Sequence, residues 1–135
     1  MKRWWTYQRE RFPLVEHGPL IAVFSFCAVS YSAQLRDAVP GAGAAVVAFV
    51  VCLLTFLQLR IADEFKDAGE DSRYRPYRPI PRGLVTLREL GRIWFGAIVV
   101  QAVTVLVFDP RLVFLLLATW AYLGLMSVEF FARRW

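Results

Sequence analysis

The most unusual stretch of the chain is an acidic segment that separates two apolar runs. Asp63, Asp67 and Asp71 recur every four residues, so on a helix their side chains project from nearly one face. Like charges at that spacing repel by roughly 0.2 to 0.5 kcal/mol per pair, and a hard divalent cation among them removes the repulsion. Glu64 adds a fourth carboxylate beside them. The spacing of these carboxylates therefore predicts a Mg²⁺ site in this segment.

Arginines follow the acidic segment within a dozen residues and provide the opposite charge. The segment from 60 to 92 holds eight basic and six acidic residues and includes Arg78-Pro79-Ile80-Pro81-Arg82-Gly83. Guanidinium and ammonium groups suit phosphate oxygens. Lys66 and Arg73 are therefore candidates for binding a diphosphate, by chemistry and proximity.

Local sequence signals predict how this segment is held. A helix is expected to run out of the preceding apolar stretch through Asp67, since no breaker occurs before Gly69. Three X-Pro pairs between residues 75 and 81 predict an extended course. Thr86 followed by Glu89 predicts a capping box that starts a new helix. The expected site is thus a helix end that faces an arginine-rich strap.

The composition indicates an integral membrane protein. Hydrophobic residues make up 58% of the 135, and the mean hydropathy is +0.46, far above the values of ordinary soluble domains. Four apolar segments are each close to the roughly 20 residues that cross a bilayer core; they run from Gly18 to Leu35, Gly41 to Leu59, Ile93 to Phe108 and Leu112 to Phe131. We expect an all-α bundle of about four transmembrane helices forming a single membrane domain over residues 1–135.

The basic residues predict the orientation of the bundle. If the amino terminus is cytoplasmic, 14 of the 16 Lys and Arg residues fall on the cytoplasmic side, and only Arg36 and Arg111 remain for the outer turns. Both termini and the segment from 60 to 92 are then cytoplasmic, in a bacterial inner membrane. The net charge of +5 reflects this topology and contact with anionic lipid, and no nucleic-acid motif is present.

The remaining polar and reactive residues favour ordinary roles. Residues 1–17, with Trp4, Trp5 and Tyr7 among basic side chains, are typical of an interfacial segment. Cys27 and Cys52 are interpreted as packing residues. His17 is expected to be interfacial, and Glu129 to reach the headgroups or pair with Arg133.

The acidic segment and the arginine-rich stretch after it resemble the first signature of the UbiA-type membrane prenyltransferases. That signature is Asn-Asp-x-x-Asp-x-x-x-Asp, and it is followed by Arg-Pro-Leu-x-x-Gly. In the same register the chain has Asp63-Glu64-x-x-Asp67-x-x-x-Asp71 and then Arg78-Pro79-Ile80-Pro81-Arg82-Gly83. Asp63 and Glu64 depart from the pattern but keep oxygen ligands. A second register, with Leu59 and Arg60 on the first two positions, fits less well.

The resemblance implies a helical membrane fold in which Mg²⁺ binds the diphosphate of a polyprenyl donor. By the same resemblance, the metal ligands are Asp63, Glu64, Asp67 and Asp71. Departure of the diphosphate leaves an allylic carbocation, which an electron-rich acceptor captures. Arg78 occupies the arginine position of the motif and is therefore a diphosphate ligand by resemblance, whereas Lys66 and Arg73 are candidates by chemistry and proximity alone. The resemblance also implies that Asp67, Asp71 and Arg78 are the catalytic residues.

The resemblance covers the first half of the family only, because a second aspartate motif lies in the later half. Two hypotheses follow. One is an Mg²⁺-dependent prenyltransferase part that transfers a prenyl group to an aromatic or lipid acceptor, together with a carboxy-terminal half supplied in trans or in a longer gene. The other is a non-catalytic membrane interaction or assembly subunit that keeps a degenerate acidic loop, with a transporter as a weaker third possibility.

Overall fold

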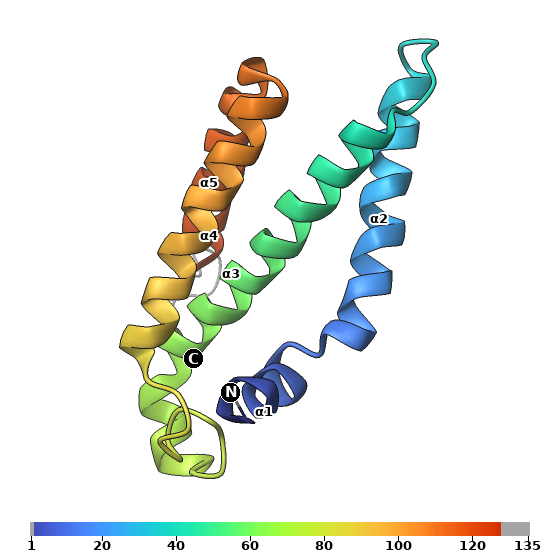
Figure 1. Cartoon of the computed structure of the whole chain (residues 1–135). Coiled ribbons are helices and arrows are strands. Elements are labelled where there is room, and N and C mark those ends of the chain that lie inside the picture. Colours follow the sequence, from blue (N-terminus) through green and yellow to red (C-terminus); the bar gives the residue numbers. More distant parts are fainter. Residues whose placement is uncertain (1, 128–135) are drawn as a thin grey trace.

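A computed structural model describes residues 2–127, and over this range the chain is helical without strands. Figure 1 shows the arrangement. The elements are α1 (Lys2–Arg11), α2 (Leu14–Gln34), α3 (Ala42–Tyr74), α4 (Leu87–Phe108), the 3₁₀ helix η1 (Pro110–Leu112) and α5 (Val113–Ser127).

Four segments are long and apolar enough to cross a membrane: α2, α3, α4, and the run from Pro110 to Ser127. The prediction of an all-α membrane bundle with about four spans is therefore confirmed. The helix that contains the third expected span is α4, and it begins at Leu87, six residues before the expected start of the span at Ile93. The expected end of the fourth span, with Glu129, Arg133 and Arg134, lies outside the described residues.

Helix α3 lies at the centre of the bundle. It packs against α2 on one side and against α4 and α5 on the other (Figure 1). A hydrogen-bonded node inside the membrane joins the last three helices, since Gln101 donates to Thr55 Oγ1 at 3.0 Å and accepts from Trp120 Nε1 at 2.9 Å. Gln101 is fully buried, and both the NH₂ group and the carbonyl oxygen of its amide have a hydrogen-bond partner. These bonds matter because lipid offers no hydrogen-bonding groups.

The polar end of α3 differs from the expectation in two ways. The helix continues past Gly69 to Tyr74, so it presents all four predicted carboxylates. The connection that follows is a series of turns rather than an extended strap, with backbone hydrogen bonds from Arg78 N to Arg75 O and from Leu84 N to Pro79 O. The predicted helix through Asp67 is confirmed, although it ends later than expected, and the predicted extended course was wrong. Hydrogen bonds and side-chain packing at this end outweigh the preferences of single residues.

A small apolar core holds the polar end together. Its buried members come from α1, α3, the turn-rich connection and α4; they are Tyr7, Ile61, Val85 and Leu90. The predicted capping box at the start of α4 is confirmed, because Thr86 Oγ1 accepts from Glu89 N and Glu89 accepts from Thr86 N at 2.9 Å. Residues 2–11 of the expected interfacial segment form α1, which lies beside this end of the bundle (Figure 1).

Candidate functional site

Two carboxylates of α3 face inward at its polar end. Glu64 and Asp71 are seven residues apart and so lie on one line of the helix, about two turns from each other. Both are buried, with 1% and 2% of the residue exposed. A buried carboxylate requires a partner of opposite charge, and each of the two has at least one arginine.

Asp71 is bound by the turn-rich connection. Arg78 Nη1 donates to both carboxylate oxygens, at 2.9 and 2.7 Å, and Arg75 Nη1 lies 3.5 Å from Oδ1. The hydrogen bond to Asp71 raises the pKa of Arg78 above its ordinary value. These contacts bring together two residues that the sequence singled out, Asp71 and Arg78.

Glu64 is bound by α1. Arg11 Nε donates to Glu64 Oε1, whereas Glu64 Oε2 is buried and has no hydrogen-bond partner among the described residues. Tyr7 lies nearby with its hydroxyl buried and likewise unpartnered. Burial, and then the charge of Glu64, raise the pKa of Tyr7 above its usual range.

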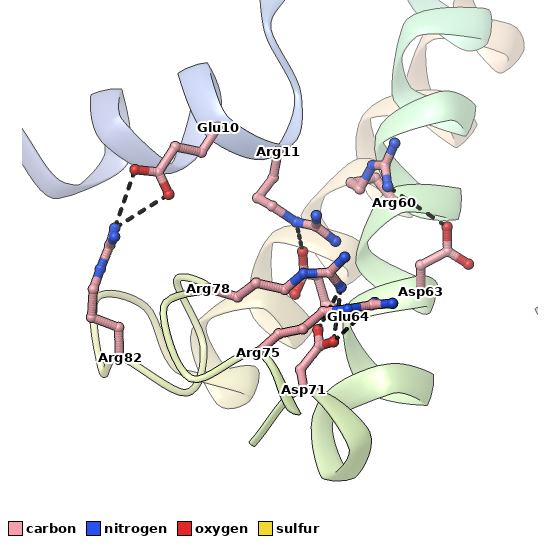
Figure 2. Close-up of polar contacts among 9 residues, drawn as sticks. All are labelled: Glu10, Arg11, Arg60, Asp63, Glu64, Asp71, Arg75, Arg78 and Arg82. Carbon is pink, nitrogen blue, oxygen red and sulfur yellow. Dashed lines mark hydrogen bonds and ion pairs between the residues drawn. The ribbon is translucent and has the colours of Figure 1, made fainter. Parts of the chain in front are cut away.

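The two pairs form one group, which Figure 2 shows from the side of α1 and the connection. We call Arg11, Glu64, Asp71, Arg75 and Arg78 the polar cluster. It contains three guanidinium groups and two carboxylates. Arg75 is half-exposed, with 48% of its side chain accessible, and Arg78 retains 20%, so the excess positive charge reaches the surface.

The other predicted residues of α3 lie outside the cluster. Asp63 is half-exposed, with its Oδ1 3.4 Å from Lys66 Nζ and its Oδ2 4.0 Å from Arg60 Nη1. Asp67 is partly buried and makes no ion pair within residues 2–127, and Arg73 is exposed. The buried line of the helix thus runs through Glu64 and Asp71, rather than through the predicted face of Asp63, Asp67 and Asp71.

The four predicted metal ligands do not converge in this arrangement. Within the described part of the chain, no three Asp, Glu, His or Cys side chains gather closely enough to hold a metal ion. Mg²⁺ prefers six oxygen ligands, but both oxygens of Asp71 already accept from Arg78, and only Oε2 of Glu64 is buried and unpartnered. These positions do not fit a four-carboxylate magnesium site. Magnesium binding stays a prediction.

Sequence reasoning missed the contribution of α1. Besides the Arg11 to Glu64 pair, Glu10 pairs with Arg82 at 3.2 Å, and Arg3 Nη2 donates to Glu89 at 2.6 Å. The backbone hydrogen bond from Thr86, and next the Arg3 hydrogen bond, lower the pKa of Glu89. The charges were visible in the sequence, but nothing in it indicated which partners were adjacent.

The arrangement is suited to binding an anionic group at the membrane surface. Carboxylates hold the arginines in place, and Arg78 and Arg11 have further N–H groups beyond those in the pairs described above. Comparison of the chain with protein-family models, curated proteins and solved structures found no match.

Proposed function

We propose that the chain is the donor-binding part of a UbiA-type prenyltransferase, which transfers a prenyl group from a polyprenyl diphosphate to an aromatic or lipid acceptor. The observation that carries the proposal is the ion pair between Asp71 and Arg78. In the resemblance, Asp71 is the last aspartate of the first signature, and Arg78 is the arginine of the Arg-Pro segment that follows it. The contact between the two side chains supports a common role for the two signatures in donor binding.

In the proposed role, the arginines of the polar cluster bind the diphosphate oxygens. Arg75 and Arg78 stabilise the negative charge that grows on the diphosphate as the allylic C–O bond breaks. Asp71 and Glu64 act as positioning residues, because each holds a guanidinium group through a hydrogen bond. The apolar spans beside the cluster provide a lipid environment for the prenyl tail.

The proposal includes a topology and a partner. With both termini and the polar cluster on the cytoplasmic side of an inner membrane, a water-soluble diphosphate group reaches the cluster while its tail lies in the bilayer. Acceptor binding and a second aspartate motif are assigned to a carboxy-terminal half, joined to this part or supplied in trans.

A binding measurement with matched ligands tests the proposal. The purified chain in detergent is titrated with geranylgeranyl diphosphate and with geranylgeraniol, which lacks the diphosphate, each with and without Mg²⁺. We expect the diphosphate to bind much more tightly than the alcohol. Equal binding of the two ligands would overturn the proposal, and a dependence on Mg²⁺ would show that the carboxylates rearrange around a metal.

One observation favours a second candidate, the non-catalytic membrane subunit. Both buried carboxylates are already neutralised by arginines from α1 or the connection. The polar cluster can therefore hold α1 and the connection against α3 without any ligand. In that case neither ligand binds specifically, while loss of either ion pair still destabilises the fold.

A further inference from the structure

Helix α1 has two faces that differ in their contacts. Trp4, Tyr7 and Arg11 are spaced three and four residues apart and lie on the inner face, against the core and Glu64. Lys2, Trp5 and Arg9 have the same spacing on another face, and all three are exposed. Trp5 has 64% of its surface accessible, which is unusual for so large a ring.

The charges of α1 divide in a similar way. Arg3, Glu10 and Arg11 each have an ion-pair partner on another element, at Glu89, Arg82 and Glu64 respectively. Lys2 and Arg9 make no ion pair to any residue between 2 and 127. The outer face therefore carries two uncompensated cations that flank an exposed tryptophan.

We propose that the outer face of α1, formed by Lys2, Trp5 and Arg9, binds the headgroups of anionic phospholipids. Charge complementarity favours anionic lipids, because each basic residue near an anionic membrane surface strengthens binding to that surface roughly fivefold. Tryptophan is enriched at the level of the headgroups. The position of α1 fits this role, since Phe12 and Pro13 alone separate it from the membrane span that starts at Leu14.

Lipid binding on the outer face stabilises what the inner face holds. Because α1 is one helix, a lipid that fixes its outer face favours the docked state, in which Arg11 pairs with Glu64 and Tyr7 is buried. The stability of the polar end is therefore expected to rise with the anionic lipid content of the membrane. This inference does not depend on the proposed function.

The test uses the full chain in nanodiscs of phosphatidylcholine alone or mixed with phosphatidylglycerol. Bound phosphatidylglycerol is measured by native mass spectrometry, and the unfolding midpoint is measured for each lipid. The test variant carries Lys2→Gln and Arg9→Gln. The control carries Arg36→Gln and Arg111→Gln, which removes the same charge from two exposed residues at the other end of the bundle.

We expect phosphatidylglycerol to raise the unfolding midpoint of the natural chain and of the control. The test variant should bind phosphatidylglycerol about twenty-five-fold more weakly, because each of the two basic residues contributes roughly fivefold, and it should lose most of the shift in the unfolding midpoint. Because both substituted side chains are exposed, the variant should match the natural chain in phosphatidylcholine alone. Equal lipid responses in the two double variants, or no effect of phosphatidylglycerol on the natural chain, would overturn the proposal.

Discussion

Asp71 has almost no contact with solvent, so its charge depends on Arg78 and Arg75. Removing one partner of a buried ion pair costs roughly 3 to 5 kcal/mol, because the other charge is left uncompensated. Arg78 keeps some access to water, which favours the lower end. We predict that Asp71→Asn lowers the free energy of unfolding by about 3 kcal/mol, measured by denaturant titration in detergent.

Asp67→Asn is the matched control for that substitution. It lies one turn earlier on the same helix and makes no ion pair within residues 2–127, so its effect should stay within about 0.5 kcal/mol. Equal losses from the two variants would show that the Asp71 pair contributes nothing particular.

The ionisation of Glu89 should make the free energy of unfolding depend on pH. Its pKa is lowered in the folded chain, so its carboxylate contributes stability at neutral pH, and this contribution is lost as the pH falls through the ordinary carboxylate range to the folded value. Glu89→Gln keeps a side chain that can complete the capping box but removes the charge. The variant should therefore be less stable at neutral pH and approach the natural chain in acid. A stability difference that is constant with pH would contradict this assignment.

At the scale of elements, the Thr86 capping box was predictable because all of its hydrogen bonds lie within four residues. The end of α3 was not. A glycine inside a helix costs about 1 kcal/mol, and tertiary contacts beyond Gly69, including the Asp71 pair with Arg78, offset that cost. The course of the connection was likewise set by backbone hydrogen bonds and by Val85 in the core, not by its prolines alone.

Substitution of Gln101 tests whether its hydrogen bonds join α3, α4 and α5. Gln101→Leu keeps the side-chain size but leaves Trp120 Nε1 and the Thr55 hydroxyl without these partners. Hydrogen bonds between membrane helices contribute roughly 0.6 to 2 kcal/mol. We expect a loss of about 1 kcal/mol in thermal or denaturant unfolding in detergent, whereas Val99→Leu on the exposed side of α4 should change little. Equal stability of Gln101→Leu and the natural chain would mean that the node does not fasten the helices.

At the scale of the whole molecule, the spans were predictable because lipid offers no hydrogen bonds and a long apolar helix is one of the few solutions. The tertiary pairs were not, since Arg11 and Glu64 are separated by 53 residues and the sequence contains several alternative charges. The sequence therefore predicted the bundle, and it singled out Asp71 and Arg78, which are in contact. It did not predict that arginines bind the buried carboxylates, or that α1 supplies one of them.

The proposed orientation rests on the distribution of basic residues and can be tested by labelling. In a background with Cys27→Ala and Cys52→Ala, single cysteines are placed at Ser72 and at Ala38, which are exposed at opposite ends of the bundle. A membrane-impermeant maleimide should label Ser72→Cys only in inside-out vesicles and Ala38→Cys only in spheroplasts. The reverse pattern would contradict a cytoplasmic polar cluster.

In the proposed function, the polar cluster binds a diphosphate through its arginines. This is tested by the affinity of geranylgeranyl diphosphate for Arg75→Gln. Arg75 is half-exposed, and Asp71 keeps both hydrogen bonds from Arg78 when Arg75 is removed, so the fold should stay intact. A charge-assisted hydrogen bond contributes roughly 1.5 to 3 kcal/mol, so binding should weaken about tenfold to a hundredfold. Arg111→Gln, the same change at the other end of the bundle, should bind like the natural chain. Equal affinities for Arg75→Gln and the natural chain would contradict the claim.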